Sequence, residues 1–366
     1  MNKILIIAPD YYPAKGGVEN FLFNLNKYLD KKYDIEIFSG TRVSPKISKK
    51  YIINNVTINK HKTFKFFGID FPISIFTYFE LFKAIKKNDI VFINDIKMLF
   101  FSIVFFTKLL NKKTILVTHG LIFHNNRYIL FKNFFIKIYL YIFKNFITKI
   151  VSNGMTDNKF LLKNMVNSNL INNGISLDKF KCNRNIIKER FVFFGRLSLN
   201  KGIENLINFL SIYKKKSPNF KLIIMGSGDF LYTKYLKKKI HNMNLSENIE
   251  LIGEFSHEEL MKELSISEFV FNPSKFESFG FTLIEALAAG CTVIASNIEQ
   301  YQLIDNGSNS FYLVDFNNNK LLFDTINKAR ANYQNANIQA IVLAKNFSID
   351  TMSQKYLKLL NEISKQ

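Results

Sequence analysis

Two glutamates, Glu277 and Glu285, stand eight positions apart in a stretch that could support group-transfer chemistry. Residues 269–271 predict a short buried strand, and residues 282–289 predict a helix that ends at Gly290. A strand that enters a helix through a glycine-containing loop leaves free backbone N–H groups at the helix start. Such a helix start favours a phosphate or a diphosphate.

We expect that anion to be held by the amides of Phe279, Gly280 and Phe281. Two carboxylates facing a phosphate would repel it, so they are better suited to accept hydroxyl groups on either side of it. A molecule that carries hydroxyl groups on both sides of a diphosphate is a nucleotide sugar. The alternative is that Glu277 is a solvated loop residue and Glu285 an exposed helix residue, and the spacing alone favours it. The strand, loop and helix around the pair favour the ligand site.

Cations follow a second predicted strand, at residues 191–194, where Arg196 and Lys201 precede a helix. Arginine offers a fork to diphosphate oxygens and lysine a point charge. Two cations at the end of a strand therefore suit the same diphosphate. Gly226 ends a further predicted strand in this half of the chain.

Strands and helices alternate through the first half, which predicts an α/β fold with a parallel, doubly wound sheet. In such sheets the ligand lies at the carboxyl ends of the strands. His119 follows a strand at residues 114–118, so it is a candidate for substrate contact or else a hydrogen-bonded structural histidine. Gly16 and Gly17 precede a helix at residues 18–29, where they permit close approach to an anionic ligand or form a simple tight turn.

The 366 residues exceed one ordinary core, and their 48% hydrophobic content excludes wholesale disorder. Cys182 and Cys291 show neither metal-site spacing nor a disulfide framework, which fits a reducing cytoplasm. The apolar run that forms the first predicted strand is too short for a signal peptide. We predict domains at 1–180 and 181–348, and a final helix at 349–366 that packs back on the first domain.

Net charge is +21, and residues 1–180 carry +16 of it, with 27 Lys/Arg against 11 Asp/Glu. Nucleic acid, anionic membrane and acidic glycan are the partners that this charge allows, although compositional bias explains part of the lysine. Residues 126–150 mix lysines with aromatic residues and contain no acid. Their lysines interrupt any membrane-spanning run. We therefore predict that this segment forms either a helix at an anionic membrane surface or a buried domain helix with one solvated face.

Taken together, these features resemble the family 4 retaining glycosyltransferases of GT-B fold. The resemblance covers nearly the whole chain and combines short motifs spread along it: Gly16-Gly17-Val18-Glu19, Thr118-His119-Gly120, Asn173-Gly174-Ile175, Gly195-Arg196-Leu197, Lys201-Gly202, Gly226 with Gly228, Pro273-Ser274, Glu277-Ser278-Phe279-Gly280 and Glu285-Ala286. It implies two Rossmann-like domains that face each other across a cleft. The second domain would hold the nucleotide and the first the acceptor.

The resemblance also implies roles for individual residues. Arg196 and Lys201 would bind the diphosphate, Glu285 the ribose, Glu277 the donor sugar, and His119 would reach the sugar near its reacting carbon. The implied donor-binding set also contains Gly16, Gly17, Gly226, Ser278, Phe279, Gly280, Phe281 and Thr282. Two positions depart from the family pattern, because Gly120 stands where aspartate is frequent and Cys291 where proline is usual.

The resemblance implies no cofactor and no metal, since no Asp-x-Asp is placed to bridge a metal to the diphosphate and the cations with helix-end amides take that role. We therefore expect transfer of a hexose or N-acetylhexosamine, from a UDP-sugar first of all, to a saccharide or lipid-linked acceptor in bacterial lipopolysaccharide or capsule synthesis. The expected location is the cytoplasm, as a peripheral protein on the inner face of the membrane. The alternatives are a nucleotide-sugar epimerase on the same scaffold and a non-catalytic basic binding protein. No nucleic-acid-binding motif appears.

Overall fold

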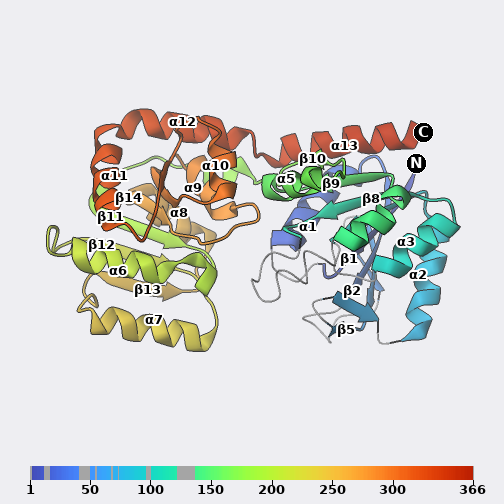
Figure 1. Cartoon of the computed structure of the whole chain (residues 1–366), viewed down its shortest axis with the longest axis horizontal. Coiled ribbons are helices and arrows are strands. Elements are labelled where there is room, and N and C mark those ends of the chain that lie inside the picture. Colours follow the sequence, from blue (N-terminus) through green and yellow to red (C-terminus); the bar gives the residue numbers. More distant parts are fainter. Residues whose placement is uncertain are drawn as a thin grey trace. The chain divides into compact units, whose positions relative to one another are not determined.

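The structure is a computed structural model that describes residues 2–11, 17–40, 50–53, 56–66, 69–72, 74–95, 100–121 and 137–365. The chain divides into two compact units, residues 1–174 with 349–366 (unit 1) and residues 175–348 (unit 2) (Figure 1). The division falls a few residues before the predicted 180/181. Ile175 already belongs to unit 2 because its backbone N–H donates to the Phe347 carbonyl at 2.8 Å.

Unit 1 is built on one sheet with the strand order β10-β9-β8-β7-β1-β2-β4-β3. Its pairs are parallel except β3 with β4. The strands are β1 (Lys3–Ala8), β2 (Asp34–Gly40), β3 (Lys50–Ile53), β4 (Val56–His61), β7 (Ile90–Asn94), β8 (Lys113–Thr118), β9 (Lys149–Ser152) and β10 (Asn169–Leu170). A separate antiparallel pair contains β5 (Thr63–Phe66) and β6 (Ile69–Pro72).

Helices cover both faces of this sheet, because its central strands are apolar on both sides. In β1, Ile4 and Ile6 pack on one face, in the same core cluster as residues of α1 (Gly17–Leu29) and α13 (Ile349–Lys365). Leu5 and Ile7 pack on the other. That second face is covered by α2 (Ile75–Lys87), α3 (Phe100–Leu109), a helical turn at 137–143 that continues into η1 (Lys144–Phe146), and α5 (Met155–Lys163).

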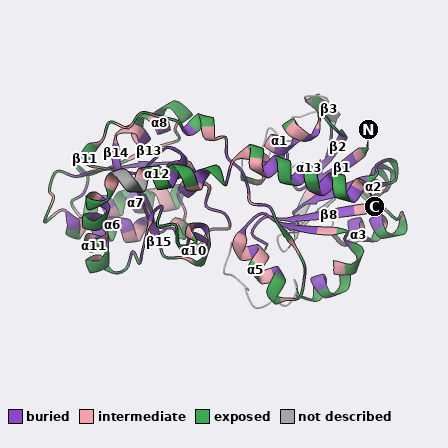
Figure 2. Cartoon of the chain, turned by 90° about the horizontal axis from the view of Figure 1, so that it is seen from above, coloured by how far each residue is buried: buried purple, intermediate pink, exposed green. Residues whose placement is uncertain are grey.

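Unit 2 has a fully parallel sheet in the order β13-β12-β11-β14-β15-β16. Its strands are β11 (Ile187–Phe194), β12 (Lys221–Met225), β13 (Ile249–Gly253), β14 (Ser267–Asn272), β15 (Val293–Ser296) and β16 (Tyr312–Val314). Its helices are α6 (Ile203–Tyr213), α7 (Phe230–Asn242), α8 (His257–Ile266), α9 (Phe281–Ala288), α10 (Glu299–Asp305), α11 (Asn319–Ala331) and α12 (Tyr333–Lys345), with short turns η2 (Leu177–Phe180) and η3 (Leu199–Lys201). Figure 2 shows the buried strands inside each unit and the exposed outer faces of the helices.

Each sheet reverses its strand order at one strand. In unit 2, β11 lies between β12 and β14, and in unit 1, β1 lies between β2 and β7. Loops leave such a reversal point in opposite directions, and the space between them is where doubly wound sheets bind ligands. In unit 2 these are the loops that carry Lys201 and Glu277.

Between the two predicted domains, residues 172–190 contain η2, and β11 already begins at Ile187. One predicted segment differs from the structure. The predicted helix at 126–150 ends at residue 146 or before, because Lys149–Ser152 pair with β8 as β9. Residues 126–136 of that helix lie outside the described residues. In the part of the chain that is described, no helix combines the length and apolar character that a membrane crossing requires.

Candidate functional site

The loops after β11 and β14 bring Lys201 and Glu277 together. The Lys201 ammonium donates to the Glu277 carboxylate, at 2.5 Å between Nζ and Oε1. Ser274 donates from its hydroxyl to the same carboxylate oxygen at 2.8 Å. The two charged side chains keep 18% and 13% of their surface exposed, so both are half-buried and a ligand can still reach them.

Glycines allow these loops to touch. Gly202 has φ +63°, and a Cβ added there would lie 2.0 Å from the Pro273 carbonyl oxygen of the other loop. The Lys275 N–H donates to the Asn200 carbonyl at 2.7 Å across the same contact. A Cβ on Gly226 would lie 1.8 Å from the Gly195 carbonyl oxygen, so the β12 loop also packs against the β11 loop. The spacing of Lys201 and Glu277 is therefore set by backbone packing.

Helix α9 begins directly after this loop, with Gly280 as its N-cap. The Leu283 and Ile284 amides bond to the Gly280 carbonyl, and no side chain caps this helix start. The amides of Phe281 and Thr282 thus remain at its open end, as expected for the first turn of a helix. Phe279 is buried, and its carbonyl accepts a bond from Gln300 Nε2 at 3.3 Å.

A buried network that the sequence did not predict supports the loop. Asn272, the last residue of β14, accepts from the Tyr301 hydroxyl at 2.9 Å and donates to Thr282 Oγ1 at 3.1 Å. Ser274 Oγ also lies 2.9 Å from Asn272 Oδ1, so its single hydroxyl proton can serve either Asn272 or Glu277. The only sequence signal for this network was the position of Asn272 at the end of a strand. Its partner Tyr301 belongs to α10, and no sequence pattern links that helix to Asn272.

Glu285 lies one turn inside α9. Burial raises the pKa of its carboxyl to about 7, and the neighbouring Lys201 charge opposes that rise. The group therefore changes charge near neutral pH.

Arg196 is exposed after β11, and within the described residues it forms no salt bridge. Ser278 lies half-buried between Glu277 and Phe279.

In unit 1 the polar residues gather at the carboxyl ends of β7, β8 and β9. His119 is 6% exposed, and its Nε2 lies 2.8 Å from Asn94 Oδ1. The Asn153 amide nitrogen lies 3.3 Å from His119 Nδ1, and the Asn153 oxygen accepts from the Tyr356 hydroxyl at 2.6 Å. These contacts match a neutral ring with its proton on Nε2. They fit the second of the two roles that the sequence allowed, a hydrogen-bonded structural histidine. Contact of His119 with a donor sugar stays a prediction.

A buried carboxylate holds the turn after β8. Asp157 accepts from the Thr118 hydroxyl and from the Gly120 N–H, each at 2.8 Å. Burial raises the pKa of Asp157 to about 6, against the opposing effect of those two bonds. Gly120, with φ +82°, suits this turn, which a Cβ would strain. Glycine at this position therefore adopts the turn without backbone strain.

Sequence reasoning missed several polar residues of unit 1 that lie just after strands. Asp10 lies two residues after β1, Asp95 directly follows β7 and Asn153 directly follows β9, and all three are buried. The same strand-end rule that selected His119 selects them.

Of the two glycines predicted before the first helix, Gly17 is exposed at the start of α1, whereas Gly16 lies outside the described residues. The described part of the chain contains no cluster of His, Cys, Asp and Glu able to hold a metal ion.

Replacement of Tyr356 by phenylalanine is expected to lower the free energy of unfolding by about 1–3 kcal/mol, because the buried Asn153 oxygen loses its hydroxyl donor. Urea denaturation measures this. Tyr33→Phe is the matched control, since Tyr33 donates to Asn361, which is exposed and can bond to water instead. Its expected change is within about 0.5 kcal/mol. Equal losses in both variants would contradict the role of the buried network.

Two family models together match most of the chain. The model described as Glycosyltransferase Family 4 matches residues 15–179, and the model described as Glycosyl transferases group 1 matches residues 176–341. Together they span residues 15–341.

Relatives and solved structures agree with these matches. The GDP-mannose:cellobiosyl-diphosphopolyprenol alpha-mannosyltransferase of Xanthomonas campestris is 24% identical over 95% of this chain and 89% of its own length. Among solved structures, an Anabaena protein, HepE, in complex with UDP superposes with a TM-score of 0.78 at 16% identity, covering 98% of this chain and 100% of that one. A Rickettsia africae glycosyltransferase gives 0.76 at 22% identity over the full length of both chains.

These likenesses confirm the expected fold, two Rossmann-like domains of GT-B type. The matched models cover most of both units, including the strand-end loops that hold Lys201, Glu277 and His119. The chain therefore belongs to glycosyltransferase family 4 and transfers a sugar from a nucleotide sugar.

Proposed function

We propose that the protein is a retaining, metal-independent transferase that moves a hexose or N-acetylhexosamine to a saccharide or lipid-linked acceptor in bacterial surface polysaccharide synthesis, lipopolysaccharide or capsule. The observation that carries this proposal is the half-buried Lys201–Glu277 pair beside the open start of α9. One cation, one carboxylate and free amides at one point suit a diphosphate that is joined to a sugar.

The donor nucleotide has two candidates. UDP-sugar is the first, and the Anabaena structure in complex with UDP supports it. GDP-mannose is the second, and the Xanthomonas relatives, which use it with a diphosphopolyprenol acceptor, support it together with a lipid-linked acceptor. We assign residues to the diphosphate, the sugar and the ribose but none to the base, so the proposed site is compatible with both.

The proposed reaction follows from the charges at this site. The bond between the sugar anomeric carbon and the diphosphate oxygen breaks, and the negative charge that develops on the diphosphate is stabilised by Lys201, Arg196 and the α9 amides. The acceptor hydroxyl oxygen bonds to the anomeric carbon on the face that the diphosphate leaves, and its proton passes to a diphosphate oxygen. Configuration is thereby retained.

The remaining residues hold the donor. Glu277 accepts hydroxyls of the donor sugar and Glu285 those of the ribose. Gly16, Gly17 and Gly226 leave room for the donor, while Ser278, Phe279, Gly280, Phe281 and Thr282 line the diphosphate and sugar. His119 is assigned to the sugar side in unit 1.

A panel of UDP-, GDP- and ADP-sugars tests the donor, first by thermal shift and then by transfer to a lipid-linked diphosphate acceptor. We expect the sugars of one nucleotide class to stabilise the protein and to be transferred. NMR of the product should show the same anomeric configuration as in the donor. A product that forms without any acceptor would indicate an epimerase. Salt-sensitive binding of polyanions without affinity for any nucleotide sugar would indicate a non-catalytic binder.

The pKa of Glu285 gives a second test. An ionised Glu285 accepts ribose hydroxyls better than a protonated one, so the affinity for the nucleotide sugar should fall about tenfold between pH 8 and pH 6 as the group protonates near pH 7. The diphosphate diester of a nucleotide sugar does not titrate in this range. Glu285→Gln should bind with no such slope, and calorimetry at both pH values measures it. A slope that persists in Glu285→Gln would remove Glu285 from the site.

The same pKa rise predicts the opposite slope for the stability of the free protein. Because the folded state raises the pKa of Glu285 above its ordinary value, the protonated form favours folding. The Glu285 contribution is present at low pH and is lost as the pH rises through 7. Denaturation of the free protein across this pH range therefore distinguishes an effect of Glu285 on folding from its effect on binding.

A further inference from the structure

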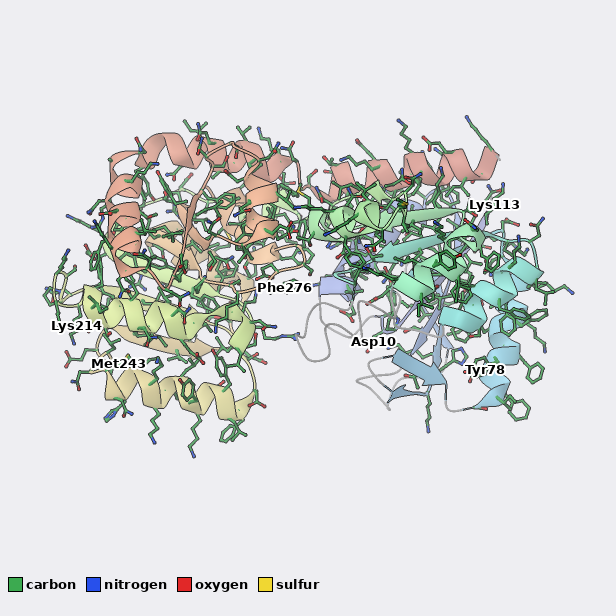
Figure 3. The ribbon with its side chains drawn as sticks, in the orientation of Figure 1. Asp10, Tyr78, Lys113, Lys214, Met243 and Phe276 are labelled. Atoms are coloured by element: carbon green, nitrogen blue, oxygen red, sulfur yellow. The ribbon has the colours of Figure 1, made fainter. Side chains whose placement is uncertain are left out.

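The outer helices of unit 1 expose large apolar side chains to solvent. The most exposed include Phe76 and Phe79 of α2, Phe105 and Leu109 of α3, and Tyr141 and Phe146 of the 137–146 segment, which are between 39% and 80% exposed. The same elements bury their inner residues in the core below the sheet. Figure 3 shows aromatic rings near the labelled Tyr78 that project outward from α2.

These side chains form one continuous face. The rings of Phe82 and Phe106 lie 5.3 Å apart and join α2 to α3. The Lys108 ammonium lies 5.4 Å from the centre of the Phe146 ring and joins α3 to η1. Figure 1 shows α2, α3 and the 137–146 segment side by side along unit 1. We call the outer surface of these three elements the α2–α3 face.

Charge on the α2–α3 face is mostly positive. Six lysines come from these elements, Lys83, Lys86, Lys87, Lys108, Lys137 and Lys144, and Lys112 follows α3 by three residues. The elements contain one acid, Glu80, which pairs with His61 at 3.2 Å, and Asp89 follows α2. Lys87 pairs with Glu36 at 3.8 Å, so within the described residues six of the seven lysines remain for an outside partner. Exposed aromatic side chains among these lysines suit the interface of an anionic bilayer, where rings enter the headgroup region and ammonium groups meet phosphates.

A recess of about 170 Å³ opens between α3 and η1, lined mostly by polar groups. Two ammonium groups and two amides line it, those of Lys108, Lys112, Asn111 and Asn145. Thr148 also lines it, and its hydroxyl oxygen accepts from the Thr114 N–H, which leaves the O–H as a donor. A lining of hydrogen-bond donors that contains no carboxylate suits a phosphate headgroup.

The recess lies at the edge of the sheet opposite His119. Lys112 and Thr148 precede β8 and β9, whereas His119 follows the last residue of β8. A bilayer at the recess therefore leaves the carboxyl ends of β7, β8 and β9 uncovered. Attachment and sugar transfer would then use different edges of unit 1.

We propose that the α2–α3 face docks unit 1 on an anionic phospholipid bilayer, with a lipid phosphate in the recess. This inference builds on the lipid-linked acceptor of the proposed function, but it concerns attachment and is measured without donor or acceptor. It places the membrane contact on α2 and α3 as well as on the segment predicted from sequence.

Vesicle sedimentation of the full chain tests the proposal. The protein should bind phosphatidylcholine vesicles that contain phosphatidylglycerol and should not bind phosphatidylcholine alone. Phe76→Ser with Phe79→Ser should weaken binding at least tenfold, and Lys108→Glu with Lys112→Glu should weaken it more than tenfold, at about fivefold for each lysine removed. Thermal melts check that the variants fold.

Helix α7 of unit 2 provides the matched controls, because it exposes the same residue types. Phe230 and Leu231 are 75% and 72% exposed, and Lys237 and Lys238 are exposed as well. Phe230→Ser with Leu231→Ser, and Lys237→Glu with Lys238→Glu, should leave vesicle binding unchanged. Loss of binding in these variants but not in those of the α2–α3 face would overturn the proposal.

Two further outcomes separate this proposal from others. A wild-type chain that ignores anionic vesicles but changes its oligomeric state when Phe76 and Phe79 are replaced would show a protein interface instead of a membrane face. Activity on a water-soluble acceptor should stay at the wild-type level in the α2–α3 variants. Loss of that activity together with vesicle binding would contradict the separation of attachment from transfer.

Discussion

Lys201→Ala is expected to lower kcat/KM by about 10²–10³-fold, because the proposed diphosphate loses the cation that stabilises its developing charge. The ammonium lies 2.5 Å from Glu277 in the free protein, so its position is already set before the donor binds. Steady-state kinetics with a saturating acceptor measures the loss. Lys275→Ala is the matched control, since Lys275 is exposed in the adjoining loop and should retain wild-type activity.

A double-mutant cycle with Glu277→Gln separates stability from function. Lys201→Ala leaves the 13% exposed Glu277 carboxylate without its cation, so it should also destabilise the fold. Adding Glu277→Gln removes that stranded charge, and the double variant should recover stability without recovering activity. Recovery of both would show that the pair serves the fold alone, and unchanged kcat/KM in Lys201→Ala would remove Lys201 from the site.

Gly202→Ala is expected to lower kcat/KM by about 10²-fold, because the added Cβ would lie 2.0 Å from the Pro273 carbonyl oxygen and must push the two site loops apart. Stability should fall as well, by more than the 1–2 kcal/mol that a left-handed residue costs. Kinetics and urea denaturation measure the two effects.

Gly307→Ala is a control that shares the backbone strain without the clash. Gly307 has φ +78°, and its added Cβ would meet nothing within 4 Å. It should lose about 1–2 kcal/mol of stability and no activity. If Gly202→Ala behaved like Gly307→Ala, the contact between the loops would not set the position of Lys201.

Short-range signals predicted the stretch around Glu277 well. The strand predicted at 269–271 is β14, and the helix predicted at 282–289 is α9, each displaced by at most two residues. Apolar runs and glycines act on neighbours in sequence, so they carry this information. Alternation of strands and helices likewise predicted the mostly parallel sheet of unit 1, which the structure confirms.

Contacts between distant segments were not predictable in the same way. No periodicity links Tyr301 to Asn272, or Tyr356 to Asn153, because these bonds depend on how separate elements pack. The salt bridge between Lys201 and Glu277 is an intermediate case. Both residues were predicted from their strand ends, but their direct contact depends on the glycine-lined approach of the two loops.

Helix α13 has a consequence for biosynthesis. It supplies Tyr356, Leu359 and Leu360 to the core of unit 1, yet it is translated after all of unit 2. The first 174 residues therefore leave the ribosome with one side of their sheet covered by α1 but not by α13, while unit 2 already has its whole sequence before α13 appears. The unit that is synthesised first is the one that finishes folding last.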